Sequence, residues 1–266
     1  MTPRYIDAHC HLQFPEYDAD QEEVIARMRE EGVGAIVVGT DLDSSRAAVA
    51  LVEEHDHLWA TVGVHPNHVS GETFDVAAFH SFAAHPKVVG IGECGLDYFR
   101  GAAPEERERQ QELFKQHIAL ASEFGKPLII HARPSKGTVD AYEGALAILK
   151  EAKAKRPDLR GIAHFFAGGS SEAEAFVALG FSLSFTAVIT FARQYDEVIR
   201  AAPLERLLAE TDAPYVAPAS RRGTRNDPLA VIDVVAQIAA VRAADSELVR
   251  ATILANTLRF FSLQAV

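Results

Sequence analysis

Short apolar runs alternate with amphipathic helical stretches along the chain, and this alternation limits the fold more than any other feature of the sequence. Helical patterns span residues 19–31, 104–124, 142–155 and 171–179. Between such stretches lie runs rich in aliphatic and β-branched residues, with the length of buried strands. These eight expected strands are residues 5–9, 35–39, 58–64, 88–92, 127–131, 161–165, 180–185 and 207–211.

Strict alternation of strands and helices implies parallel strands joined by right-handed crossovers. Eight such units in about 250 residues are typical of a (β/α)₈ TIM barrel in the α/β class. A doubly wound open sheet is the competing architecture, but no G-x-G-x-x-G turn follows the first strand and the chain has no P-loop. No repeat or linker divides the sequence. We therefore expect a single domain over residues 1–266 that finishes with a helical region at 227–261.

The amino-acid composition indicates a globular protein and limits the kinds of partner that it can bind. The 266 residues are 48% hydrophobic and 24% charged, which is ordinary for a globular protein. The net charge of −11 argues against a broad basic surface for nucleic acid, so a polyanionic substrate would be held by bound cations or a small basic cluster. Cys10 and Cys94 cannot form a disulfide framework. With no leader and no membrane-length apolar run, we expect a cytoplasmic monomer or weak oligomer with no membrane partner.

Polar residues with metal-binding side chains occur where the expected strands end. His9 and His11 end the first strand on one face, because side chains alternate along a strand, and Cys10 between them faces outward. The others are His65 after strand three, Glu93 at the end of strand four, His131 at the end of strand five, His164 on strand six and Asp212 after strand eight. In a barrel these ends converge on one mouth, where barrel enzymes place their active sites.

Spacing alone would not identify a metal site. The same H-x-H spacing occurs at His55 and His57 after a helical stretch, where the rings are expected to diverge on a solvated end. We expect structural or surface roles for these two and for His80, His85 and His117.

Four histidines and two carboxylates exceed the ligands that one ion needs. They predict a divalent centre of two ions, with Mg²⁺, Mn²⁺ or Zn²⁺ as candidates. In this hypothesis His9, His11 and Asp212 bind one ion, His131 and His164 bind the other, and Glu93 bridges them. Two ions can activate a shared water, so the implied chemistry is hydrolysis with Glu93 and Asp212 as the catalytic residues and Asp212 as the natural general base. Glu210 is expected to be a helper or a structural partner.

A basic segment follows the last expected strand. Arg221, Arg222 and Arg225 lie in the sequence ASRRGTRN, and Arg133 comes two residues after His131. A solvated surface loop is the ordinary fate of such a charge cluster. At the C-terminal end of strand eight, however, the loop would bring three guanidiniums to the mouth, and guanidinium binds phosphate in bidentate fashion.

Seven segments together resemble the TatD family of metal-dependent deoxyribonucleases in the amidohydrolase superfamily. In chain order they are IDAHCHL, VGVHP, GIGECGLDYF, KPLIIHAR, AHFF, LLAETDAPYVAP and RRGTRNDP. The resemblance implies a TIM barrel with a divalent-metal centre at its mouth, with ligands His9, His11, Glu93, His131, His164 and Asp212. It also implies cleavage of phosphodiester bonds at DNA strand ends, often from the 3′ end and often with Mg²⁺. By the same resemblance His65 contacts phosphate or lies next to the metal.

Three departures from the family pattern fall at the mouth. Asn67 stands where a second histidine commonly follows the proline of VGVHP, and His68 comes next. The fifth-strand loop reads HARPSKG in place of H-S-R-D-A, and the sixth reads HFFAG in place of H-C-F-S-G. The ligands survive these changes, whereas substrate contacts are open to change.

Two other functions use the same residues differently. One is an amidohydrolase-type esterase, lactonase or D-aminoacyl-tRNA deacylase with the same metal centre, for which the arginines would be dispensable. The other is a binding or scaffold barrel whose histidines are structural, which would gain no stability from divalent ions.

Overall fold

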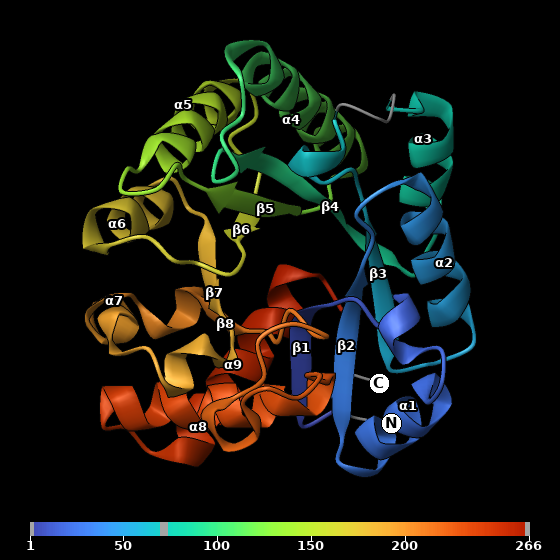
Figure 1. Ribbon diagram of the computed structural model, residues 1–266, viewed down its shortest axis with the longest axis vertical. Coiled ribbons are helices and arrows are strands. Elements are labelled where there is room, and N and C mark those ends of the chain that lie inside the picture. The colour runs from blue at the N-terminus through green and yellow to red at the C-terminus, as the bar shows by residue number, and fades with distance from the viewer. Residues whose placement is uncertain (1–2, 70–73, 264–266) are drawn as a thin grey trace.

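The computed structural model describes residues 3–69 and 74–263, and it forms an eight-stranded barrel of parallel strands surrounded by helices (Figure 1). The strands pair in sequence order, from the first to the eighth. They are β1 Tyr5–Cys10, β2 Val33–Val38, β3 Leu58–Val62, β4 Val88–Asp97, β5 Leu128–Arg133, β6 Gly161–Ala163, β7 Ser182–Phe185 and β8 Leu207–Ala209. The TIM-barrel prediction is confirmed.

The ring closes between the chain just after β8 and the end of β1. Ala213 forms a parallel bridge with Cys10, and its carbonyl accepts a hydrogen bond from the His11 amide at 2.8 Å. The Asp212 amide donates to the His9 carbonyl at 2.9 Å. The seam thus consists of the segments that carry His9, His11 and Asp212, and closing the barrel places these three residues together.

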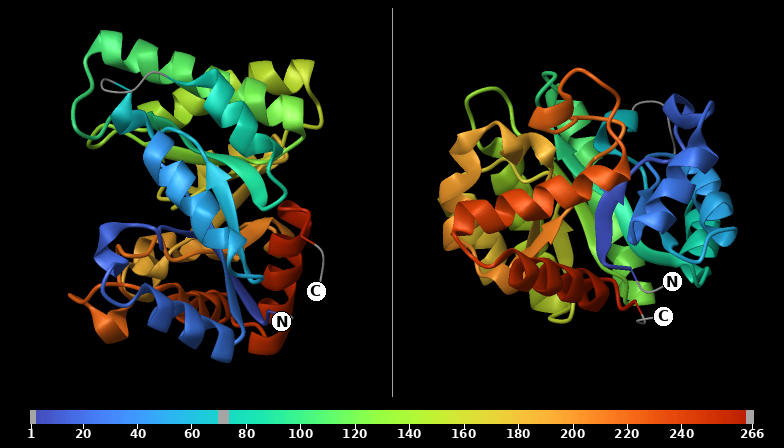
Figure 2. Two further views of the ribbon diagram at one scale, coloured as in Figure 1. Left: turned by 90° about the vertical axis from the view of Figure 1, so that its right-hand side faces the viewer. Right: turned by 90° about the horizontal axis from the view of Figure 1, so that it is seen from below.

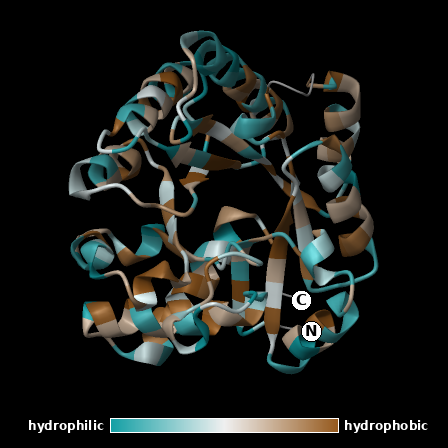
Figure 3. Ribbon diagram, in the orientation of Figure 1, coloured by the Kyte–Doolittle hydropathy of each residue, from teal (hydrophilic) through white to brown (hydrophobic). Residues whose placement is uncertain are grey.

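The longer helices cover the outside of the barrel, with their polar faces outward (Figures 2 and 3). Their bounds are α1 Gln21–Glu30, α2 Leu42–Glu53, α3 Val76–Ala84, α4 Pro104–Phe124, α5 Asp140–Lys155, α6 Ser170–Ala178, α7 Asp196–Ala201, α8 Val231–Arg242 and α9 Ser246–Phe260. The expected C-terminal region at 227–261 divides into α8 and α9 at Ala243, whose left-handed backbone (φ 49°) ends α8. Within the described part of the chain, no helix is both long and apolar enough to cross a membrane.

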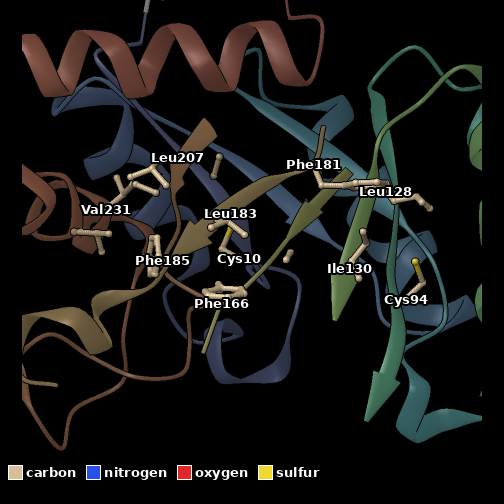
Figure 4. Packing of buried hydrophobic residues seen from close by; sticks show 14 of the residues in the cluster. Cys10, Cys94, Leu128, Ile130, Phe166, Phe181, Leu183, Phe185, Leu207 and Val231 are labelled. Atoms are coloured by element: carbon tan, nitrogen blue, oxygen red, sulfur yellow. The ribbon is translucent and has the colours of Figure 1, made fainter. Parts of the chain in front are cut away.

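Strand parity divides the apolar interior into two cores. On β2, Val33, Ala35 and Val37 pack outward against the helices, whereas Ile36 and Val38 point into the barrel. The outer core contains both cysteines, as the alternation of side chains predicted, together with aromatic rings such as Phe166 and Phe185 (Figure 4). The inner core is smaller and includes Phe260 and Phe261 from the end of α9.

Strand β4 is longer than the sequence pattern predicted. It continues five residues past the expected end at residue 92, so Glu93 lies within the strand and Asp97 is its last residue. β5 extends in parallel to Arg133, which is the register partner of Asp97. Each strand supplies backbone hydrogen-bond partners for the other. Because of this pairing, both strands continue past the ends of their apolar segments.

The H-x-H pair at His55 and His57 does not lie on a solvated end, so that expectation was wrong. His57 is buried, its ring lies 6.1 Å from that of His55, and β3 begins at the next residue, Leu58. His57 directly precedes β3, and its carbonyl accepts a hydrogen bond from the Ala35 amide of β2 at 3.1 Å. The pair contributes to none of the clusters of three or more metal-binding side chains in the described residues.

Candidate metal centre

Six side chains from five parts of the barrel converge at the C-terminal ends of the strands. These are the six residues expected from the sequence, namely His9, His11, Glu93, His131, His164 and Asp212. They can be grouped as two adjacent clusters on either side of the Glu93 carboxylate. The clusters are in contact, since His9, His164 and Asp212 also form a group of possible ligands.

The first cluster joins the two histidines of β1 to carboxylates from β4 and from beyond β8. The Nε2 atoms of His9 and His11 are 3.2 Å apart. Glu93 Oε2 lies 3.4 Å from His9 Nε2 and 3.9 Å from His11 Nε2. Asp212 Oδ1 lies 3.6 Å and 3.4 Å from the same two atoms. Both imidazole nitrogens therefore face both carboxylates.

The second cluster uses the other oxygen of Glu93. Oε1 lies 2.8 Å from His131 Nδ1 and 2.8 Å from His164 Nε2, and these two nitrogens are 3.3 Å apart. A neighbouring group of His65, Asp97 and His131 also brings three possible ligand atoms within reach of one another.

These separations fit divalent ions. Ligands about 2.0–2.1 Å from a tetrahedral ion lie roughly 3.3–3.4 Å from one another, and the first cluster has edges close to this value. His11 Nδ1 lies 2.8 Å from the Val38 carbonyl and donates its proton there, so Nε2 presents a lone pair toward His9. Two buried imidazole nitrogens that face each other beside two carboxylates are a suitable set of ligands for a divalent cation.

Carboxylates behind the ligands hold two of the imidazole rings. Asp97 Oδ2 lies 3.0 Å from His131 Nε2, the ring nitrogen directed away from Glu93. Glu210 Oε1 lies 3.4 Å from His164 Nδ1 and accepts a hydrogen bond from the Phe165 amide at 2.6 Å. Such outer partners fix the orientation of metal-binding histidines and raise their basicity. Glu210 therefore has the partner position expected of it.

A third buried carboxylate ties β1 to the segment after β8. Asp7 Oδ1 accepts from the amides of His9 at 3.1 Å and Thr211 at 2.9 Å, and Oδ2 accepts from the Thr211 hydroxyl. Burial raises the pKa of Asp7 well above its usual value, although these hydrogen bonds oppose the rise. Its contacts fix the backbone next to His9 and Asp212.

Burial and mutual charge set the protonation of the centre. Burial, followed by the nearby His164, lowers the pKa of His9 to about 4, so its ring is neutral at neutral pH. Burial opposes ionisation of Glu93, but His164, His65 and hydrogen bonds from His131 and His164 hold its pKa well below the usual range. The carboxylate at the middle of the centre is therefore charged and ready to bind cations.

The centre opens into a cavity of about 680 Å³ at the mouth. Its lining includes five of the six candidate metal ligands, namely His11, Glu93, His131, His164 and Asp212. The rest of the rim combines aromatic and basic groups with small ones, among them Phe14, His65, His68, Arg100, Arg133, Phe165 and Tyr215. A substrate larger than a water molecule thus has direct access to both clusters.

Two of the five residues predicted to contact phosphate line the cavity. His65 and Arg133 line the cavity, and His65 Nε2 lies 3.5 Å from Glu93 Oε1. Arg221 pairs with Asp227 at 3.1 Å and Arg225 pairs with Asp20 at 2.6 Å.

Arg222 stacks on Phe191, and none of the three loop arginines is among the described residues that line the cavity. The described cavity wall therefore lacks the three guanidiniums expected there, and Arg221 and Arg225 are held by acidic neighbours.

Sequence reasoning missed Asp97, Asp7 and Arg100. Asp97 had a usable signal, because it lies four residues after Glu93 and so has the same strand parity, provided that the strand continues. Asp7 has the parity of His9 and His11 but lies one step deeper. Arg100 lies in an irregular loop after β4, where sequence spacing does not fix direction.

Comparison with known proteins identifies the family. The family model described as TatD related DNase matches residues 6–262. The uncharacterized metal-dependent hydrolase YabD of Bacillus subtilis (strain 168) is 39% identical over 261 residues, which cover 97% of this chain and 98% of that protein. The protein of Klebsiella pneumoniae (strain 342) named 3′-5′ ssDNA/RNA exonuclease TatD is 34% identical over 267 residues, covering 97% of each.

The fold has equally close counterparts among solved structures. The crystal structure of YJJV, a TatD homolog from Escherichia coli K12, superimposes with a TM-score of 0.88 at 30% identity. The match covers 99% of this chain and 100% of that one. Because the family match spans almost the whole chain and the barrel agrees throughout, this chain belongs to the TatD family of metal-dependent hydrolases.

Proposed function

We propose that this protein is a divalent-metal-dependent deoxyribonuclease that hydrolyses phosphodiester bonds at the ends of DNA strands. The observation that carries the proposal is the pair of clusters joined by Glu93, whose two oxygens face separate sets of imidazole ligands. The relative from Klebsiella pneumoniae is named for exonuclease activity, which supports the choice of substrate. The open cavity supports a strand end as the bound group.

The residues of the chain have distinct tasks in this reaction. Bound divalent ions would lower the pKa of a water molecule and neutralise charge on the phosphoryl oxygens. Asp212 lines the cavity beside His9 and His11, where its carboxylate can accept the proton of the attacking water. Glu93 supplies a negative charge to both clusters and holds them at a fixed separation. Asp97 and Glu210 keep the imidazoles of His131 and His164 in place.

Cations at the rim suit a substrate with phosphates. Arg100, Arg133, His65 and His68 lie around the cavity of an otherwise acidic protein. Arg133 extends from the end of β5, two residues beyond His131, and so lies next to the second cluster. A guanidinium there can bind the phosphate of the reacting nucleotide or its neighbour.

End-labelled single-stranded DNA with Mg²⁺ or Mn²⁺ tests the proposal on a denaturing gel. We expect a ladder of shortened products that chelator abolishes and that the Asp212→Ala variant fails to produce. The Asp158→Ala variant is a matched control, since Asp158 is an exposed acid paired with Arg156. Product formation by Asp212→Ala equal to that of the unmodified chain would refute the assignment.

The same centre could act on carboxylic esters or lactones, or on D-aminoacyl-tRNA, so these substrates belong in the same experiment. Ester turnover with DNA left intact, and with activity indifferent to Arg133→Ala, would replace the nuclease assignment by an esterase or deacylase. Purified protein that contains no metal and gains no thermal stability from Mn²⁺ or Zn²⁺ would favour a binding barrel instead.

A further inference from the structure

Two arginine–phenylalanine stacks lie on loops at the C-terminal end of the barrel, and Arg133 of the first stack lines the cavity. The guanidinium carbon of Arg133 lies 3.9 Å from the centre of the Phe99 ring, and that of Arg222 lies 3.8 Å from the centre of the Phe191 ring. Phe99 is 47% exposed and Phe191 is 37% exposed, so each ring keeps much of its surface in water. Exposed rings at the end of the barrel that carries the candidate metal centre are typical of binding surfaces.

Each stack joins two neighbouring loops and is held in place by hydrogen bonds. The Phe99 amide donates to Asp97 Oδ1 at 3.0 Å, and the adjacent Tyr98 amide donates to the Arg133 carbonyl at 2.8 Å. On the other side, the Ala219 amide donates to Thr190 Oγ1 at 2.8 Å, which links the loop that follows β7 to the loop that carries Arg222. Both rings are therefore positioned before any substrate binds.

The two arginines of these stacks keep their charge available. Neither Arg133 nor Arg222 forms an ion pair with a residue in the described ranges, whereas Arg221 and Arg225 are paired with Asp227 and Asp20. In a chain with a net charge of −11, two guanidiniums that lie on aromatic faces without an acidic partner among the described residues suit an anionic ligand that carries flat rings.

The stacks lie on different sides of the barrel mouth. Phe99 follows β4 and Arg133 ends β5, whereas Phe191 follows β7 and Arg222 follows β8. In a closed ring paired in sequence order, β4 is opposite β8, as the labels in Figure 1 show.

We propose that the Phe99–Arg133 and Phe191–Arg222 stacks bind unpaired bases of a single-stranded polynucleotide that crosses the mouth over the metal centre. The inference rests on the proposed nuclease function and adds to it the two positions that recognise the strand. A base stacks on the open face of the ring or on the outer plane of the guanidinium, while the charge reaches the neighbouring phosphate. Duplex bases are stacked on one another and cannot offer these faces, so the protein prefers single strands.

Steady-state kinetics on two substrates test the proposal with the intact, metal-loaded enzyme. The first substrate is a single-stranded oligonucleotide, and the second is bis(p-nitrophenyl) phosphate, a small diester that has no nucleobase and cannot span both stacks. Phe99→Leu and Phe191→Leu keep an apolar side chain but lose the aromatic face. We expect each to raise KM for the oligonucleotide about five- to tenfold with little change in kcat, and to leave hydrolysis of the small diester unchanged.

The Phe124→Leu variant is the matched control, because that ring ends α4 at the opposite end of the barrel. A second measurement replaces one nucleotide at a time by an abasic spacer. A spacer at a stacked position weakens binding to the unmodified chain and has no further effect on the variant that lacks the corresponding ring.

Two failures are distinguishable. Cleavage of the oligonucleotide with unchanged KM in both variants, and spacer effects that simply add to the variant effects, would overturn the stacking positions while the nuclease remains. Absence of metal-dependent cleavage of both substrates by the unmodified chain would overturn the proposed function itself.

Discussion

Asp97 Oδ2 lies 3.0 Å from Nε2 of His131, on the side of the ring opposite to Glu93. The imidazole thus lies between two carboxylates from the same strand. Burial disfavours the charged ring, but hydrogen bonds to Asp97 and Glu93 raise the pKa of His131 above its usual value. The contact fixes the orientation of the ring and its basicity, both of which affect how strongly it binds a metal ion.

The Asp97→Asn variant should therefore bind metal more weakly. The substitution keeps the size of the side chain and removes its charge, and loss of an outer carboxylate typically lowers affinity about 10–100-fold. Calorimetric titration with Mn²⁺ or Zn²⁺ measures the change, with Asp158→Asn as the control for removal of an exposed acid. Equal affinity of the Asp97 variant and the unmodified chain would show that the contact does not support the metal centre.

Metal binding should release protons. Burial opposes protonation of His164, but the negative charge of Glu93 and the contact with Glu210 raise its pKa well above the usual value, so the metal-free ring is protonated at neutral pH. A ligand nitrogen must give up its proton, and affinity should therefore fall as the pH falls. Calorimetry in two buffers of different ionisation enthalpy measures the released protons. A binding enthalpy that is independent of the buffer would contradict this prediction.

His117 should make the fold sensitive to acid. Burial lowers its pKa to about 4, and the neutral ring accepts from the Val64 amide at 2.9 Å and donates to the Leu113 carbonyl at 2.8 Å. The unfolded chain takes up this proton near pH 6.5, so the stabilisation is complete above that value and is lost as the pH falls to about 4. The loss amounts to about 3 kcal/mol.

Urea unfolding of metal-free protein at several pH values measures this contribution. His117→Gln should be less stable than the unmodified chain at pH 7, and the difference should shrink toward pH 4. His80→Gln is the control, because that ring is exposed and pairs with Glu123 at the surface. A difference that stays constant across the range would assign the acid sensitivity to other groups.

Phe261 should be important for stability although it lies far from the mouth. Its ring is 3% exposed and packs in the inner core, where it meets the Phe260 ring edge to face at 4.8 Å. Truncation of a buried phenylalanine costs about 3–5 kcal/mol, so Phe261→Ala should lower the unfolding midpoint strongly. Leu248→Ala removes an exposed apolar side chain from α9 and should have little effect. A small change for Phe261→Ala would show that α9 does not complete the inner core.

Most of the fold could be predicted from the sequence, because the spacing of apolar residues and the residues that begin and end helices depend only on neighbours in the chain. Helix α4 begins and ends where Pro104 and Gly125 indicate. The end of β4 could not be predicted, because residues 93–97 remain in the strand through pairing with β5 and not through their own preference. Asp97 was missed for the same reason, and His57 was misplaced because its burial depends on the strand that follows it.

The sequence by itself determined the eight-unit barrel and the six residues expected to bind metal, since strand ends in a parallel barrel must meet at one mouth. The tertiary structure decided which atoms face one another. It directed the two oxygens of Glu93 toward different histidines, and it placed Asp97 and Glu210 behind the imidazoles. It also paired Arg221 and Arg225 with acids and left Arg133 and Arg222 stacked on exposed rings. These pairings join residues far apart in the chain, and their distances depend on how loops pack, which no local pattern contains.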